Sequence, residues 1–207
     1  MNEPSAPADA AGPAGAAPAA GAARAAGVDD PGGIRALVTV EPVRPEDLPA
    51  VAACFDELSP TARWRRFHAP VPQVPAAFLA DLARRAAEGL VVLARAGDRV
   101  VGVAELAPDG TGPGRYEAAV VVADDWRRRG VARALLRDLG ARFPGAHVVA
   151  HVQHDNVGAL RLAGDVAPTA DRHLDDGVVI ELAVPRPRRA AHARSSTSSY
   201  PARRHAM

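Results

Sequence analysis

An arginine-rich turn ahead of an amphipathic segment is the part of this sequence best suited to chemistry. It lies in VVVADDWRRRGVARALL, residues 120–136. Gly130 has no side chain, so a ligand can approach the first turn of the following helix, where backbone N–H groups lack partners and the helix dipole favours anions. Ala132 is also small and keeps that approach open. Because charge is added by Arg127, Arg128, Arg129 and Arg133, the turn predicts a diphosphate ligand.

The spacing of apolar residues predicts the elements on either side of this turn. Apolar positions 131, 135, 136 and 139 recur at helical spacing, and the strand-like segment AHVVAHV follows at 146–152. A helix that joins two Val-rich strands indicates a crossover unit. Upstream, residues 90–106 contain two Val-rich runs around a Gly-Asp turn at 97–98, and residues 114–123 supply a third, which predicts an antiparallel meander.

Further helices and strands are expected at both ends of the chain. Pro45 suits the first position of a helix over residues 44–58, and Ser59 offers an N-cap for a second, short helix that ends near Phe67. The other expected elements are a strand at 36–43, a helix at 76–86, a helix at 156–163, an irregular segment, and a last strand at 178–184.

The composition predicts one folded domain between two low-complexity ends. The 207 residues carry 25 Lys+Arg against 24 Asp+Glu, which excludes a histone-like polycation and an acidic disordered protein. Residues 1–35 are Ala, Gly and Pro with almost nothing large to bury, and residues 186–207 are mostly Arg, Ser and small residues, so we expect both to be disordered. Residues 36–185 form a unit of about 150 residues, which can bury roughly 70% of its extended-chain surface in one core.

Cysteine usage and hydropathy bear on where the protein works. Cys54 stands alone in an Ala-rich apolar stretch, where a reduced and packed thiol is expected rather than a nucleophile. No apolar run approaches the ~18 residues of a membrane helix, and the N-terminus does not read as a secretory signal. A cytoplasmic monomer or homodimer is the expectation.

The pattern Arg127-x-x-Gly130-x-Ala132 resembles the acyl-CoA signature of the GCN5-related N-acetyltransferase (GNAT) family, which is Gln/Arg-x-x-Gly-x-Gly/Ala at the start of a helix. The resemblance extends over residues 38–184 and includes Asn156-x-x-Ala159-x-x-Leu162, which is similar to an Asn-x-x-Ala-x-x-Leu helix of that family. It implies an α/β fold with a mixed central sheet flanked by helices. It also implies an enzyme that transfers an acyl group from acetyl-CoA to a primary amine and needs no metal.

The same resemblance implies which residues hold acetyl-CoA. Val122 would offer strand backbone groups to the pantetheine and the thioester, and the helix that begins at Asn156 would lie beside the pantetheine arm. The pyrophosphate would be held by the turn and the first helical residues, which are Arg127, Arg128, Arg129, Gly130, Val131, Ala132 and Arg133.

Acyl transfer to an amine requires a base, because a lysine amine with a pKa near ~10.4 is almost wholly protonated at neutral pH. The resemblance places an acidic residue of the strand entering the motif near the acceptor, and in this sequence that residue is Glu117. It would act directly or through a water molecule. The alternatives are that Glu117 is a solvated strand carboxylate, or that Glu105 on the neighbouring strand is the base.

Two departures from the family pattern leave other functions open. GNAT proteins often carry a Tyr seven residues after the motif's Asn as general acid, but here that position is Ala163, and the Gly-Phe that usually ends the helix is missing. A non-catalytic acyl-CoA-binding sensor is therefore the competing hypothesis. Weak nucleic-acid binding through the Arg-rich tail is a third, although a solvated tail is favoured.

The acceptor is suggested by a second, narrower resemblance. The segment ELSPTARWRRFHAPV, residues 57–71, looks like the acceptor side of bacterial protein-lysine acetyltransferases, which favours protein lysine ahead of a small amine such as a drug, polyamine or amino acid. A metal site is not expected from His147, His151 and His154, because strand residues four apart lie roughly 13 Å from one another.

Overall fold

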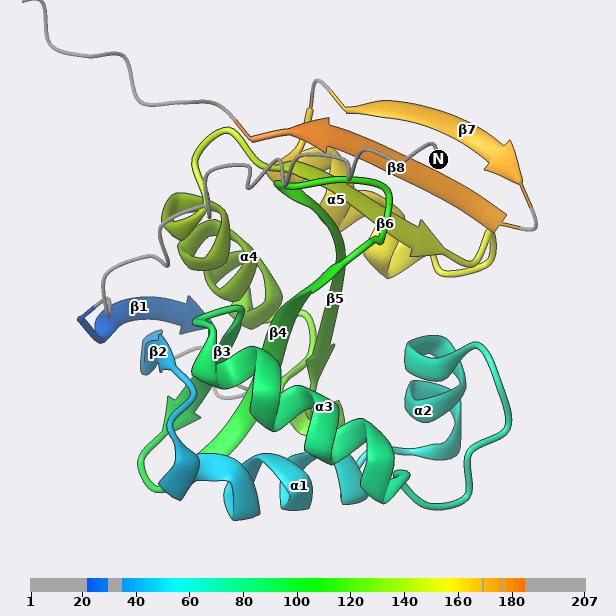
Figure 1. The fold of residues 1–207 in the computed structure, drawn as a ribbon. Helices are drawn as coiled ribbons and strands as arrows, with labels where there is room; N and C mark the ends of the chain where they lie inside the picture. Colours follow the sequence, from blue (N-terminus) through cyan, green and yellow to red (C-terminus); the bar gives the residue numbers. More distant parts are fainter. Residues whose placement is uncertain (1–21, 30–34, 169, 176, 185–207) are drawn as a thin grey trace, which may run out of the picture.

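The computed structural model describes residues 22–29, 35–168, 170–175 and 177–184, which form one eight-stranded sheet in the order β1-β2-β3-β4-β5-β6-β8-β7 (Figure 1). Neighbouring strands are antiparallel except for β5 and β6, which are parallel. The strands are β1 (Arg24–Asp29), β2 (Arg35–Pro42), β3 (Val91–Ala96), β4 (Arg99–Pro108), β5 (Arg115–Val122), β6 (His147–Val152), β7 (Asp171–Asp175) and β8 (Gly177–Ala183).

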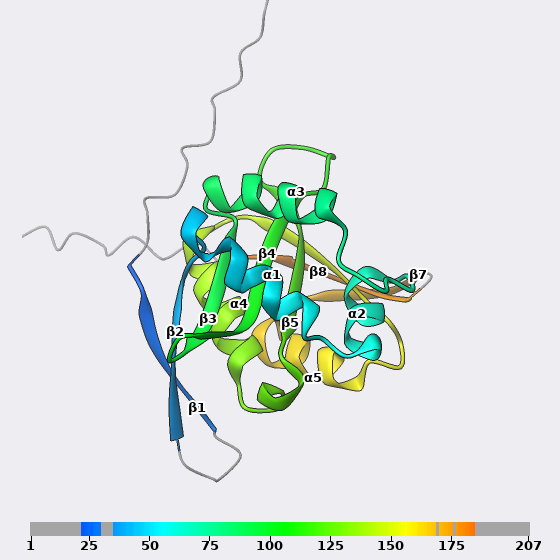
Figure 2. The ribbon, with the colours of Figure 1, turned by 90° about the horizontal axis from the view of Figure 1, so that it is seen from below.

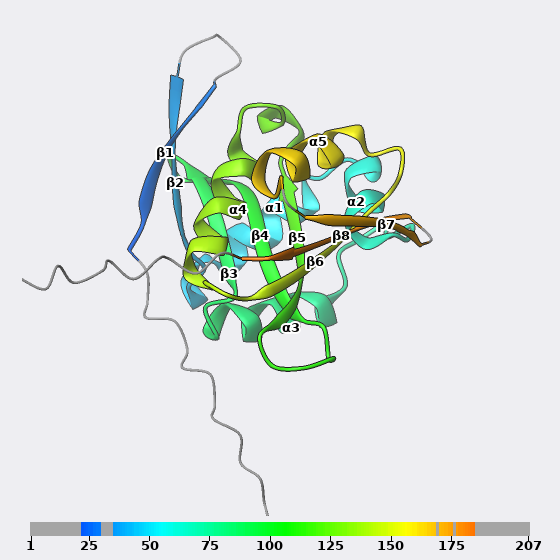
Figure 3. The same cartoon turned by 90° about the horizontal axis from the view of Figure 1, so that it is seen from above.

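Helices cover both faces of this sheet. The helices are α1 (Leu48–Asp56), α2 (Pro60–Phe67), α3 (Ala76–Ala87), α4 (Val131–Arg142) and α5 (Val157–Val166), with short 3-10 turns η1 (Pro45–Asp47) and η2 (Asp124–Trp126). Seen from below and from above, α1 and α3 lie on one face and α4 and α5 on the other (Figures 2 and 3). The short helix α2 lies beside β5. None of these helices is long and apolar enough to cross a bilayer.

The alternation of side chains along β3 creates a core on each face. Val91 and Leu93 are fully buried against the side covered by α1 and α3, in the cluster that contains Phe55. Val92 and Ala94 point the other way, into the cluster that contains Leu135 of α4. Because both faces are covered, the central strands are apolar at nearly every position.

Strands β5 and β6 diverge soon after they meet. They pair only from Arg115 to Glu117 on β5 and from His147 to Val149 on β6. Strand β5 continues to Val122, and no strand in the described part of the chain pairs with the β6-facing edge of residues 118–122. Figure 1 shows the two strands separating below this short seam. The sheet therefore opens beside the crossover helix α4.

The structure confirms the expected helices, the β3-β4-β5 meander and the parallel crossover from β5 through α4 to β6. Two strands differ from the expectation. Strand β1 falls inside the leader expected to be disordered, and β7 falls in the segment expected to be irregular. Both are edge strands that pair through their backbone with one neighbour, so neither needs the large apolar side chains by which a buried strand is recognised. The tail at 186–207 and the first 21 residues of the leader lie outside the described residues.

Candidate active site

The arginine-rich turn presents free backbone donors at the N-terminus of α4. Arg128 and Gly130 both adopt left-handed backbone angles, with φ of 61° and 88°. The first helical hydrogen bond runs from the N–H of Ala134 to the carbonyl of Gly130 at 2.9 Å. The N–H groups of residues 131–133 have no acceptor in the described part of the chain, and Gly130 supplies no side-chain cap. Three donors at the positive end of the helix dipole therefore suit a diphosphate.

Three of the four arginines around this turn already have partners. Arg127 pairs with Asp124 at 2.9 Å, and Arg133 forms an ion pair with Asp165 on α5. The guanidinium of Arg129 lies over the ring of Trp126, 5.1 Å from its centroid. Arg128 is exposed and contacts no charged partner among the described residues, so it is the arginine most available to an incoming phosphate.

A cavity of about 390 Å³ lies where β5 and β6 separate. It extends between α4 and α5 on one side and reaches the end of α2 on the other. Its apolar lining includes Leu136, Phe143, Val148, Val152, Leu162 and Val166. A channel of this size and polarity suits a flexible arm with few charges.

The backbone of Val122 points into the opening between the strands. The N–H of Ala123 donates to the carbonyl of Val101 on β4 at 2.9 Å, and the β4-β5 register is continuous across this region. Since peptide groups alternate between the two edges of a strand, the N–H and C=O of Val122 face away from β4. The predicted contact of Val122 with a pantetheine arm therefore has the required orientation, as it has for Val120 and Ala118.

Glu117 lines the cavity, at the last position where β5 pairs with β6. Its side chain is exposed and makes no hydrogen bond or ion pair with the described residues. His68, just after α2, and His151 on β6 line the same cavity, together with Arg65. A carboxylate that is solvated, unpaired and open to the cavity is able to accept a proton.

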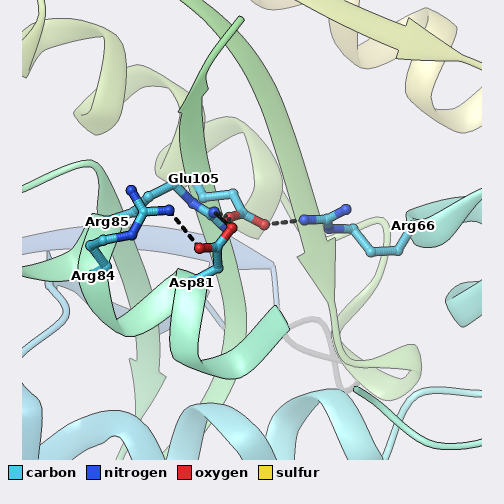
Figure 4. A network of polar contacts seen from close by, with 5 residues as sticks. All are labelled: Arg66, Asp81, Arg84, Arg85 and Glu105. Atoms are coloured by element: carbon cyan, nitrogen blue, oxygen red, sulfur yellow. Dashed lines mark hydrogen bonds and ion pairs between the residues drawn. The ribbon is translucent and has the colours of Figure 1, made fainter. Parts of the chain in front are cut away.

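Glu105, the alternative base, is committed to ion pairs instead (Figure 4). Its side chain is buried, Oε1 pairs with Arg66 of α2, and Oε2 accepts bonds from Nε and Nη2 of Arg85 of α3 at 3.1 and 2.6 Å. Arg66 also lies over the rings of Phe67 and Phe78. Both carboxylate oxygens of Glu105 are thus occupied by guanidinium donors, an arrangement that favours a structural role for Glu105 in holding Arg66 over a role as the base.

Asn156 and Ala163 lie on the α5 side of the cavity. The Asn156 side chain caps α5 by accepting a hydrogen bond from the N–H of Ala159 at 3.3 Å. Ala163 contributes only a methyl group, so this position offers no proton donor. The described residues contain no group of three or more His, Cys, Asp or Glu side chains arranged to hold a metal ion.

Two contacts near the site were not expected from the sequence. Arg66 lines the cavity while it is held by Glu105, although nothing in the sequence pattern distinguishes it from Arg63 and Arg65. Asp124 pairs with Arg127 within the turn, and it also accepts hydrogen bonds from Ser59 at the start of α2. Contacts between residues so far apart in sequence leave no signal in local spacing.

Comparisons with known proteins agree with this geometry. The model of the acetyltransferase (GNAT) family matches residues 51–164, a span that runs from α1 through the arginine-rich turn to α5. The chain belongs to the GNAT acetyltransferase family. A search of curated proteins gave no significant match.

Solved structures show the same fold at low sequence identity. The GNAT domain of S. lividans PAT is 21% identical, with a TM-score of 0.65 over 78% of this chain and 96% of that domain. The putative acetyltransferase yncA from Salmonella typhimurium, solved with acetyl-CoA, is 17% identical, with a TM-score of 0.59 over 74% and 96%. A ribosomal-protein-alanine N-acetyltransferase from Brucella melitensis is 18% identical, with a TM-score of 0.52 over 69% and 96%. The expected GNAT fold is therefore confirmed.

Proposed function

We propose that this GNAT protein transfers the acetyl group of acetyl-CoA to a primary amine of a protein lysine, by direct attack within a ternary complex. The observation that carries the proposal is the open edge of β5 between two sites of matching chemistry. At one end lie the free N–H groups of residues 131–133, and at the other lies the unpaired carboxylate of Glu117. An extended thioester with an anionic end fits along this edge, with its reactive carbon toward Glu117.

The reaction follows from these positions. Glu117, or a water that it orders, takes a proton from the ammonium group of the acceptor, and the neutral amine nitrogen then attacks the thioester carbonyl. Backbone N–H groups of β5 polarise the carbonyl oxygen as negative charge develops on it. The carbon–sulfur bond breaks, and the departing thiolate takes up a proton from solvent in the open cavity, because Ala163 offers none. Binding both substrates at once removes most of the entropic cost of their encounter.

Two exposed apolar side chains, each next in sequence to a residue that lines the cavity, support a protein acceptor; we call Trp64, beside Arg65, and Val157, beside Asn156, the rim. Trp64 on α2 is 47% exposed and Val157 at the start of α5 is 53% exposed. The side-chain Nε2 of Gln153 donates to the carbonyl of Trp64 at 3.4 Å, which brings the β6-α5 loop against α2 beside the cavity. A small amine is too small to pack on this rim, whereas the polypeptide on either side of an acceptor lysine can do so. Tryptophan is a frequent hot-spot residue in protein interfaces.

Release of free CoA with different amines tests the activity. We expect release with acetyl-CoA and a lysine-containing peptide. Glu117→Gln should lower kcat by about 10²-fold or more, since a positioned base contributes roughly 10²–10⁴. Glu88→Gln is the matched control, because Glu88 is exposed at the end of α3 and lies outside the cavity lining. Binding of acetyl-CoA without release in the presence of any amine would instead support the acyl-CoA sensor, which the methyl group at Ala163 favours.

The acceptor class is tested by a change at the rim. Trp64→Ala should raise the KM for a peptide or protein lysine several-fold and leave the KM for a small amine unchanged. Thr61→Ala, an exposed position on α2 outside the lining, serves as control. Faster turnover of small amines than of peptides by the wild-type protein, with no effect of Trp64→Ala on either, would assign the enzyme to small amines.

A further inference from the structure

The turn that precedes α4 is tied directly to the helix that borders the acceptor end of the cavity. The carboxylate of Asp124 accepts two hydrogen bonds from Ser59, from its backbone N–H at 2.9 Å and from its hydroxyl at 3.1 Å. The same carboxylate pairs with Arg127 at 2.9 Å. A single side chain therefore joins the arginine-rich turn to a residue 65 positions earlier in the sequence.

Ser59 is the N-cap of α2, so its orientation sets the direction in which that helix begins. Its hydroxyl oxygen accepts a hydrogen bond from the N–H of Ala62 at 3.3 Å. Because the same hydroxyl donates its proton to Asp124, the cap and the link form one chain of hydrogen bonds. Loss of the carboxylate leaves the hydroxyl free to rotate and removes the acceptor of the Ser59 N–H.

The other end of α2 forms a wall of the cavity. Arg65 and Arg66 belong to its last turn, and His68 follows directly; all three line the same cavity as Glu117. Arg66 is anchored by Glu105, and the carbonyl of Trp64 is held by Gln153. An eight-residue helix is about 12 Å long and behaves as a rigid unit. The contact that fixes its N-terminus therefore also affects the position of its last turn, which lines the cavity.

We propose that Asp124 is a positioning residue through which occupation of the arginine-rich turn strengthens acceptor binding, and this proposal rests on the proposed function. A diphosphate and Asp124 are both anions and compete for Arg127. When the diphosphate draws Arg127 away, the carboxylate keeps Ser59 as its partner among the described residues, and its hydrogen bonds to the cap of α2 become stronger. The end of α2 that lines the cavity is then held more firmly in place.

This link makes the two substrates bind cooperatively. Coupling between binding sites is reciprocal, so an acceptor peptide must raise the affinity for acetyl-CoA by the same factor by which acetyl-CoA raises the affinity for the peptide. We expect a factor of about five or more, the lower end of what such couplings usually reach. In Asp124→Ala and Ser59→Ala the factor should fall toward one, while the affinity for acetyl-CoA alone changes much less.

The measurement is the dissociation constant of acetyl-CoA, determined by calorimetry with and without a lysine peptide blocked by N-methylation, together with hydrogen exchange of residues 60–67. Acetyl-CoA should slow exchange of these amides in the wild-type protein and in Ser59→Thr, which keeps the hydroxyl, but not in Asp124→Ala or Ser59→Ala. The double variant should lose no more coupling than either single variant, because both changes break the same link.

Asp125→Ala is the matched control. Asp125 neighbours Asp124, but its carboxylate bonds to Arg99 at 2.7 Å, whereas the Ser59 hydroxyl and N–H bond to Asp124, so loss of Asp125 should leave the cooperativity intact. Normal acetyl-CoA binding with equal cooperativity in the wild-type protein and Asp124→Ala overturns the link and leaves the proposed function standing. A wild-type protein that does not bind acetyl-CoA overturns both.

Discussion

Replacement of Gly130 by alanine tests whether the arginine-rich turn binds the coenzyme. Gly130 has φ of 88°, a backbone conformation that L-residues adopt at a cost of roughly 1–2 kcal/mol. Without ligand, the turn of Gly130→Ala can relax toward an ordinary conformation. With a diphosphate bound, the N–H groups of residues 131–133 must converge on it, so the strain returns in the bound state. We expect the dissociation constant for acetyl-CoA to rise by about 5- to 30-fold, since 1.4 kcal/mol corresponds to a factor of ten.

Thermal unfolding provides the assay. Acetyl-CoA at 100 times its dissociation constant stabilises the wild-type protein by about 2.7 kcal/mol, which for a domain of this size corresponds to a shift in Tm of roughly 5–11 °C. At the same ligand concentration a tenfold weaker complex gains only about 1.4 kcal/mol, so the shift of Gly130→Ala should be about half that of the wild-type protein.

Gly97→Ala is the matched control for backbone strain. Gly97 lies in the β3-β4 turn with φ of 57°, and a Cβ added there meets no atom within 4 Å. This variant should lose a comparable amount of intrinsic stability and keep the full shift with acetyl-CoA. The reasoning is refuted if Gly130→Ala and Gly97→Ala show the same shift as the wild-type protein.

Three further predictions follow from other parts of the molecule. A Cβ at Gly102 on β4 would lie 3.0 Å from the carbonyl oxygen of Val121 and 3.2 Å from Val131, so Gly102→Ala should destabilise the protein by about 1–3 kcal/mol in urea denaturation and weaken acetyl-CoA binding. Burial raises the pKa of the Cys54 thiol to about 11, so thiol reagents at pH 8 should label the folded protein far more slowly than the protein in denaturant. The hydrogen bond from Arg99 lowers the pKa of Asp125. The ionised Asp125 carboxylate therefore stabilises the folded protein above pH ~3.9, and this contribution is lost as the pH falls below that value. The difference in free energy of unfolding between the wild-type protein and Asp125→Asn should accordingly shrink between pH 7 and pH 3.

The part of the site built from consecutive residues could be predicted from the sequence. The turn from Arg127 to Ala132 combines a strand, a glycine and an amphipathic helix within a few residues, and local rules describe such combinations well. Ser59 as a helix cap follows from the same kind of local chemistry, and its hydroxyl does accept the N–H of Ala62. The crossover geometry then places Glu117 on the strand that leads into the turn.

Pairings between distant residues could not be predicted from a single sequence. Whether Glu105 faces solvent or two guanidinium groups depends on how α2 and α3 pack against β4, and that packing is set by the whole core. The edge strand β1 was not predicted, for a different reason. It pairs through backbone groups, which every residue possesses, and its sequence is rich in small residues that favour no particular structure.

The short contact between β5 and β6 divides the sheet into two blocks, one of five strands and one of three. The two blocks pair with each other through three pairs of residues. Hydrogen bonds across this junction are few, so the two blocks depend on the helices behind them for their relative orientation. A substrate that lies along the open edge of β5 would contact both blocks and supply hydrogen bonds where β5 and β6 do not pair. The coenzyme would then serve as a structural brace as well as a reactant, and the protein should open first at this junction when it is empty.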